Sequence, residues 1–162
     1  MEVLEELECW LKGKPQLREA DLETNTLTPE TTMLMLQYHA CVVMAVRPPT
    51  LRALEQKLRI SSEANSLRID SLTQPISYAV GAACATVRTL RRHAAARGLA
   101  VYGFLDGEQA FSASQLLIMT NAAVPSLQIS QSIITYSLNV LAHIAERGND
   151  DTRQQMESLI RL

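Results

Sequence analysis

The strongest constraint on this chain is a helix candidate that is apolar on every side. From Phe111 to Met119 the sequence reads Phe-Ser-Ala-Ser-Gln-Leu-Leu-Ile-Met, and its large apolar residues fall on all faces of a helix. A helix that is apolar all round is buried inside a protein. Asp106 can accept a backbone N–H of the first turn, and Gln109 can reach back to the N–H of Asp106. We therefore expect a central, buried helix that begins at Asp106.

Six further segments carry helical periodicity or helix start and stop signals. Their expected bounds are Glu2–Leu11, Thr28–Val46, a short helix from Pro49 or Thr50, Gln74–Arg97, Ile129–Ala145, and a last helix capped by Asn149 or Asp150 with Met156, Leu159 and Ile160 inward. No segment alternates in the manner of a strand. The sequence predicts an all-α fold, an irregular multi-helix bundle of about six or seven helices around the central apolar helix.

Prolines set two of the expected helix bounds. Pro48 forces its predecessor Arg47 out of the α region, so the second helix is expected to stop there. Pro75 suits the first turn of a helix, where its missing N–H costs nothing. Residues 61–71 are polar and rich in Ser, Asn and Asp, and we expect this segment to be flexible. Residues 1–162 are expected to form a single domain.

Composition and charge exclude several classes of function. The net charge of -2 gives no general attraction to nucleic acid or to an anionic membrane. The three cysteines, Cys9, Cys41 and Cys84, are far from metal-ligand spacing and suit a reducing compartment. The apolar region Met33–Val46 is too short to span a bilayer. The sequence thus predicts a soluble intracellular protein without a metal or a bound cofactor.

The sequence contains no recognisable catalytic constellation. His39, His93 and His143 fall on three different expected helices, and no carboxylate or cysteine stands at ligand spacing from them. His39 is expected to be a core histidine with a hydrogen-bond partner. No nucleophile-elbow, zinc-protease or phosphate-loop motif occurs. We expect that the protein is not an enzyme.

Two features leave binding functions open. Basic residues crowd the carboxyl half of the fourth expected helix: Arg88, Arg91, Arg92, His93 and Arg97. A solvated helix end, stabilised by the helix dipole, accounts for them, and an acidic partner or an anion is the alternative. Apolar helices can also line a ligand cavity, which sequence does not distinguish from a filled core.

Several blocks, taken in order, resemble the middle homology region of fungal zinc-cluster transcription factors, the fungal-specific transcription factor domain of xylanolytic-activator type. The first is the Tyr-His helix followed by Arg-Pro, here Leu34, Leu36, Tyr38, His39, Arg47 and Pro48. The second is the Phe-x-Asp then Phe-Ser-Ala block, here Phe104, Asp106, Phe111, Ser112 and Ala113. The segment from Leu7 through Trp10 to Pro15 is similar to the approach that precedes the Tyr-His helix.

The resemblance implies a structural signature made of Tyr38, His39, Arg47, Pro48, Phe104, Asp106, Phe111 and Ser112. It does not imply catalytic, cofactor-binding or metal-binding residues. The zinc cluster of the family, with its cysteines and basic stretch, has no counterpart here, so zinc and direct DNA binding are not expected of this chain. The chain is expected to be the later part of a regulatory domain, as a fragment, a truncated product or a partial gene model.

The expected function is therefore that of a nuclear regulatory module. It would modulate RNA polymerase II-dependent transcription through homologous transcription factor subunits, coregulators or a small-molecule effector, without contacting DNA or a membrane. Two alternatives stay open. One is a free-standing interaction or dimerisation protein that antagonises full-length homologues, and the other is a helical small-ligand receptor.

Overall fold

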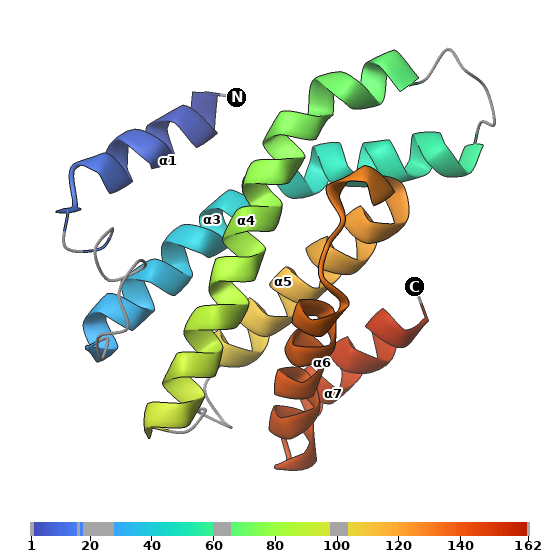
Figure 1. Ribbon diagram of the computed structural model, residues 1–162. Helices are drawn as coiled ribbons and strands as arrows, with labels where there is room; N and C mark the ends of the chain where they lie inside the picture. Colours follow the sequence, from blue (N-terminus) through green and yellow to red (C-terminus); the bar gives the residue numbers. More distant parts are fainter. Residues whose placement is uncertain (1, 16, 18–27, 60–65, 98–103, 162) are drawn as a thin grey trace.

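The computed structural model describes residues 2–15, 17, 28–59, 66–97 and 104–161. These residues form six α-helices and one 3-10 helix, with no strand among them (Figure 1). In chain order they are α1 (Glu2–Lys12), α3 (Pro29–Arg59), α4 (Ser66–Arg97), α5 (Phe104–Ala123), η2 (Pro125–Leu127), α6 (Gln131–Glu146) and α7 (Asp150–Ile160). The prediction of an all-α, multi-helix bundle is confirmed.

Helix α5 lies at the centre of the bundle, as its all-round apolar character predicted. It contacts α3, α4, α6, α7 and η2. Its residues Leu116 and Leu117 are fully buried, and Phe111 and Ile118 are half-buried. The core divides into two apolar clusters; α3, α4, α5 and α6 contribute to both, and Leu159 of α7 belongs to the second.

Helix α3 corrects the prediction of a stop at the prolines. It begins at Pro29 as expected, and Thr28 caps it by accepting the N–H of Thr31 at 3.2 Å. It then continues through Pro48 and Pro49 to Arg59. Neither proline can donate a helical hydrogen bond. The blue and teal parts of α3 run in different directions in Figure 1, as expected of a proline kink.

Core packing explains why α3 continues past the prolines. Val46 and Thr50 lie one helical turn apart, and both are fully buried. The hydroxyl of Thr50 donates a hydrogen bond to the carbonyl of Val46 at 2.9 Å. This bond lies next to the two helical hydrogen bonds that Pro48 and Pro49 cannot donate. Ending the helix at Arg47 would remove Thr50 from the core. The gain from burial therefore outweighs the local preference against proline.

Helix α4 also differs from its expected start. It begins at Ser66 and carries Pro75 in its interior. Residues 66–71, part of the segment expected to be flexible, belong to its first turns, and residues 60–65 lie outside the described part of the chain. Directly after Pro75, Ile76 and Ala79 are fully buried in the core. These contacts anchor the part of the helix that follows the proline.

The expected N-cap at Asp106 is wrong. Helix α5 begins at Phe104, so Asp106 lies in the first turn, where a carboxylate interacts favourably with the helix dipole. Asp106 and Gln109 are both buried and line a small hollow against α3. Both residues therefore lie against α3 in the first turns of the helix.

The carboxyl-terminal helices follow the predicted signals. Helix α5 ends before Pro125, and Gly148, with a positive φ of 99°, follows the end of α6. Asn149 caps α7 by accepting the N–H of Thr152 at 3.0 Å. Leu159 is buried as expected, but Ile160 is 74% exposed. The exposure of Ile160 corrects its predicted inward position.

Candidate ligand pocket between α1, α3 and α4

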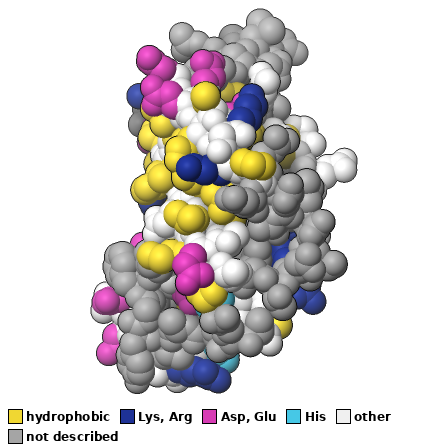
Figure 2. All heavy atoms as spheres, turned by 90° about the vertical axis from the view of Figure 1, so that its left-hand side faces the viewer, with side chains coloured by type: hydrophobic (Ala, Val, Ile, Leu, Met, Phe, Trp, Pro, Cys, Tyr) yellow, Lys and Arg dark blue, Asp and Glu magenta, His cyan; other side chains and the backbone are white. Residues whose placement is uncertain are grey.

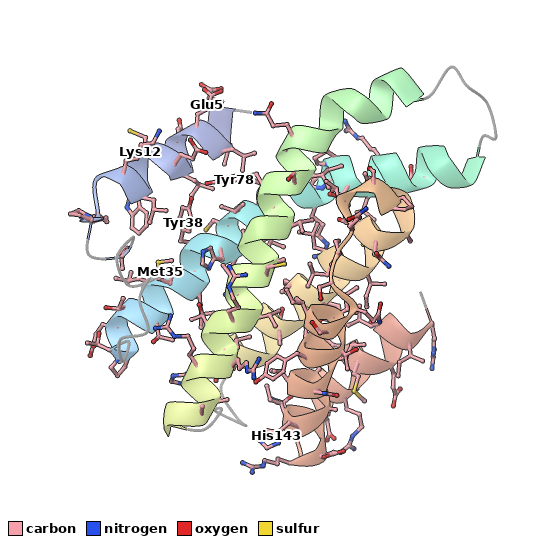
Figure 3. All side chains as sticks on the ribbon, in the orientation of Figure 1. Glu5, Lys12, Met35, Tyr38, Tyr78 and His143 are labelled. Atoms are coloured by element: carbon pink, nitrogen blue, oxygen red, sulfur yellow. The ribbon has the colours of Figure 1, made fainter. Side chains whose placement is uncertain are left out.

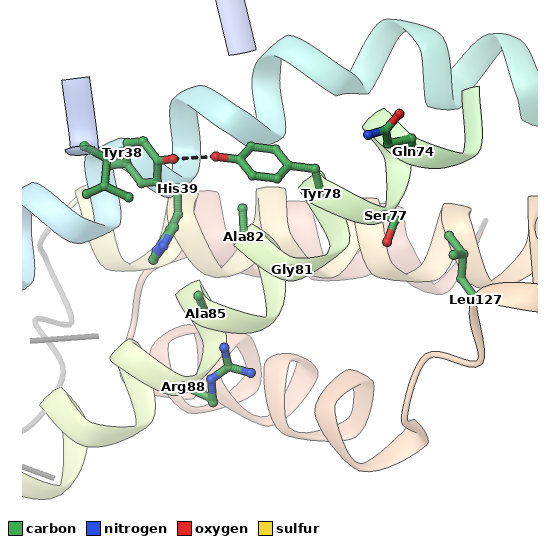
Figure 4. A pocket seen from close by; sticks show the side chains of 11 residues that line it. Tyr38, His39, Gln74, Ser77, Tyr78, Gly81, Ala82, Ala85, Arg88 and Leu127 are labelled. Carbon is green, nitrogen blue, oxygen red and sulfur yellow. Dashed lines mark hydrogen bonds between the residues drawn. The ribbon is translucent and has the colours of Figure 1, made fainter. Parts of the chain in front are cut away.

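An open pocket of about 820 Å³ lies between α1, α3 and α4 (Figure 4). Helix α1 lies across this side of the bundle and contributes no buried residue, although Leu4, Leu7 and Leu11 pack partly against the core. The pocket is lined by Leu11, Tyr38, His39, Gln74, Ser77, Tyr78, Gly81, Ala82, Ala85, Arg88 and Leu127.

A pair of tyrosines forms one wall of the pocket. The hydroxyls of Tyr38 on α3 and Tyr78 on α4 lie 2.6 Å apart and share a hydrogen bond (Figures 3 and 4). The ring of Tyr38 stacks on Trp10 of α1 at a centroid distance of 6.0 Å, with 16° between the planes. The His39 ring meets the Tyr38 ring edge-on at 5.4 Å. Tyr38 lies on α3 and therefore links it to both other helices that surround the pocket, α1 and α4.

Small residues of α4 form the floor of the pocket. Gly81, Ala82 and Ala85 line it together with Ser77, one turn earlier. A Cβ atom added at Gly81 would meet nothing within 4 Å. Glycine inside a helix costs about 1 kcal/mol relative to alanine, and no close approach requires it here. The space above Gly81 is thus open volume.

The charge of the lining is positive. Among the described residues that line it, Arg88 and His39 are the side chains that can carry positive charge, and none is an aspartate or glutamate. The two ion pairs among the described residues, Lys12–Glu8 and Arg153–Asp150, do not involve Arg88. Burial raises the pKa of the nearby Cys84 thiol, and the positive charge of Arg88 partly offsets this rise.

A second hollow adjoins the first beneath α1. It has a volume of about 220 Å³ and shares Gln74 and Tyr78 with the main pocket. Its other lining residues include Glu5 and Glu8 of α1. The two hollows therefore differ in charge, with carboxylates at the α1 end and a guanidinium at the Arg88 end.

The structure brings two of the eight signature residues to the pocket, Tyr38 and His39. Farther along α3, Arg47 is half-buried and Pro48 is exposed. On α5, Asp106 is buried, Phe111 and Ser112 are half-buried, and the side chain of Phe104 lies outside the described part of the structure. The signature residues are thus spread over the bundle and do not form one site.

The three histidines remain separate, on α3, α4 and α6. His39 is buried, and His93 and His143 are half-buried. Within the described residues, no group of three His, Cys, Asp or Glu side chains is placed to hold a metal ion. In the basic cluster, the guanidinium of Arg91 lies 5.3 Å from the ring centroid of Tyr136 on α6, away from the pocket-lining set.

Sequence reasoning missed Tyr78, Gly81 and the polar residues Gln74 and Ser77. The available signal was a run of small residues at every fourth position of α4, Ser77, Gly81 and Ala85. Such spacing places them on one helix face. The pairing of Tyr78 with Tyr38 left no signal, because it depends on how α3 and α4 cross.

None of the described helices has the length and apolar character needed to cross a membrane. Comparison of the chain with protein-family models, with curated proteins and with solved structures found no match.

Proposed function

We propose that this chain is a helical regulatory module that acts by binding and not by catalysis. In this proposal the chain is a module of the same type as the middle homology region of fungal zinc-cluster transcription factors. It acts in the nucleus, modulates RNA polymerase II-dependent transcription, and contacts an effector, a homologous subunit or a coregulator instead of DNA. The ordered sequence blocks and the all-α bundle support this proposal.

One observation carries the proposal: Tyr38 and His39, the Tyr-His block of the resemblance, line the pocket between α1, α3 and α4. Tyr38 stacks on Trp10 of α1 and shares a hydrogen bond with Tyr78 of α4. An occupant that touches Tyr38 therefore acts on the packing of three helices at once. A ligand shifts a conformational equilibrium when it contacts the two states differently, and this arrangement provides such a difference.

A tethering assay tests the regulatory role. The full chain is fused between a heterologous DNA-binding domain and an activation domain, and reporter output is compared with that of the fusion lacking the chain. We expect the chain to change the output, and the pocket-filling variant Gly81→Leu to reduce that change. Output that is the same with and without the chain would overturn the proposal. Immunostaining of the epitope-tagged chain tests the nuclear location.

A specific surface feature favours the interaction-protein alternative. Large apolar side chains are exposed on α3, including Leu34 at 47%, Met44 at 58% and Leu51 at 41%. From Cys41 through Met44 and Pro48 to Leu51 the exposed residues follow the alternating three- and four-residue spacing of a coiled-coil seam, and Leu34 lies seven residues before Cys41. Hydrophobic side chains also gather on the surface on the side where α1 lies (Figure 2).

The regulatory module and the interaction protein differ in whether their function depends on this exposed seam of α3. If the chain acts as an antagonist, Met44→Glu should abolish co-purification with a homologous transcription factor. Ser126→Glu, at an exposed position of η2, is the matched control and should have no effect. A monomer that co-purifies with no homologue would remove this candidate.

A further inference from the structure

We propose that the pocket between α1, α3 and α4 binds a small monocarboxylic acid with a flat apolar body. The carboxylate pairs with Arg88, and the opposite end of the molecule contacts the hydroxyl of Tyr78. This assignment rests on the proposed function, that the module acts by binding, and adds the chemical class of the effector.

The size and the floor of the pocket suit a flat apolar body. A volume of about 820 Å³ falls within the range of natural small-molecule sites. The floor of Gly81, Ala82 and Ala85 offers a smooth surface of helix backbone and methyl groups. The rings of Tyr38 and Tyr78 border it. Aromatic rings and small aliphatic groups gain free energy by covering a planar apolar molecule.

The charge of the ligand follows from Arg88. Arg88 lines the pocket and takes part in neither of the ion pairs formed by the described residues. A guanidinium offers a planar fork of N–H donors that matches a carboxylate. The described lining residues include no carboxylate, so the Arg88 end of the pocket holds no counter-charge for a cation.

The length of the ligand follows from the helix. Tyr78 and Arg88 are ten residues apart on α4, which corresponds to a rise of about 15 Å. Helical side chains tilt toward the amino end of the helix, so the guanidinium lies over the floor on the side of Tyr78. The hydroxyl of Tyr78 can form a further hydrogen bond beyond the one it shares with Tyr38. A ligand shorter than about 15 Å can therefore reach both groups.

The restriction to one carboxylate follows from α1. Glu5 and Glu8 line the adjoining hollow, next to Gln74 and Tyr78. A second anionic group at that end of the ligand would be repelled by Glu5, whereas Glu8 pairs with Lys12. The site therefore distinguishes monocarboxylates from dicarboxylates of the same length.

Calorimetric titration of the full chain with three probes on one scaffold tests the assignment. The probes are 6-hydroxy-2-naphthoate, its neutral analogue 6-hydroxy-2-naphthamide, and 2,6-naphthalenedicarboxylate. We expect 6-hydroxy-2-naphthoate to bind about ten-fold more tightly than either of the other two, because the amide loses one charge-assisted hydrogen bond and the dicarboxylate places a second charge near Glu5. Equal affinity for the acid and the amide, or no binding of the acid, would overturn the assignment.

Variants locate the site. Arg88→Gln should remove the preference for the acid over the amide. Arg91→Gln, an exposed arginine of the same helix that lies over Tyr136, should keep that preference. Gly81→Leu should weaken all binding about ten-fold or more while the thermal unfolding of the chain stays cooperative. Equal effects of Arg88→Gln and Arg91→Gln would mean that general charge, and not this pocket, selects the acid, and would overturn the proposal.

The tethering assay separates this proposal from the proposed function. If the chain changes reporter output but the protein prefers no acid over its amide, the ligand class is wrong and the regulatory role stands. If the acid preference depends on Arg88 but the chain leaves the reporter unchanged, the binding site stands and the regulatory role is wrong.

Discussion

The hydroxyls of Tyr38 and Tyr78, which are 40 residues apart in the sequence, lie 2.6 Å from one another. Their hydrogen bond joins α3 to α4 at the wall of the pocket. Tyr38 is 6% exposed, and the hydrogen bond between the two hydroxyls is partly buried. A buried hydroxyl that loses a partner pays the cost of its desolvation, which makes this pair sensitive to substitution.

Tyr78→Phe should lower the free energy of unfolding by about 1 kcal/mol, because it leaves the Tyr38 hydroxyl without this partner. The double variant Tyr38→Phe/Tyr78→Phe should cost less than the sum of the two single variants. Urea denaturation of the four proteins measures this coupling. Strict additivity would show that the two hydroxyls do not interact in solution.

Gly107→Ala should destabilise the junction between α5 and α7. A Cβ atom at Gly107 would lie 2.6 Å from Oγ1 of Thr152, a side chain that is only 2% exposed. Overpacking of this kind costs about 1–3 kcal/mol. Thermal unfolding should show a lower midpoint, and Thr152→Ala in the same chain should recover part of the loss. A Gly107→Ala chain of unchanged stability would contradict this close approach.

Gly81→Ala should have the opposite effect. The added Cβ atom meets nothing within 4 Å, so the change improves helix propensity without a clash. We expect a gain of about 1 kcal/mol in the free energy of unfolding, measured in urea. A loss of stability would mean that α1 lies closer to α4 in solution than it does here.

Asn149→Ala should destabilise the start of α7, because the Asn149 side chain accepts the N–H of Thr152 at 3.0 Å. Loss of such a cap costs about 1 kcal/mol. Asn149→Asp keeps the acceptor and serves as the control. Amide hydrogen exchange should be faster at the first turn of α7 in the alanine variant and near the original rate in the aspartate variant.

The thiol of Cys84 should react slowly with iodoacetamide in the folded protein, because burial raises its pKa and lowers the thiolate fraction. The exposed Cys9 and Cys41 should be modified first. Arg88→Gln removes the charge that lowers this pKa and should slow the reaction of Cys84 further. Mass spectrometry of modified peptides over time gives the order, and a faster reaction in Arg88→Gln would contradict the assigned cause.

The raised pKa of Cys84 also determines how the stability of the protein changes with pH. Because the pKa of Cys84 is higher in the folded state than in the unfolded state, the thiol contributes full stability below its unfolded pKa. That contribution is lost as the pH rises through the folded pKa. Cys84→Ser should therefore flatten the decline of stability at alkaline pH.

Local signals in the sequence were sufficient for the ends of several helices. Thr28 and Asn149 cap the helices they were expected to cap, and Gly148 follows the end of α6. The burial of α5 could also be predicted, because a helix apolar on all faces has no stable place outside a core. These features depend on neighbouring residues alone.

Other features depend on contacts between distant segments. The local preference of proline for helix bounds led to wrong predictions, because Pro48 and Pro49 lie inside α3 and Pro75 lies inside α4. Core burial of Val46, Thr50 and Ile76 opposes that local preference and prevails. The pocket was beyond sequence reasoning because its wall joins Tyr38 to Tyr78, and its openness depends on where α1 lies relative to Gly81.

Trp10 is the chain's single tryptophan, and it stacks on Tyr38 where α1 meets α3. Tryptophan emission in this protein therefore originates from one position, at the edge of the pocket. Excitation at wavelengths that tyrosine does not absorb reports on that position without an attached dye. A change in emission wavelength signals a change in the contact between α1 and α3, whereas unfolding confined to α7 leaves it constant.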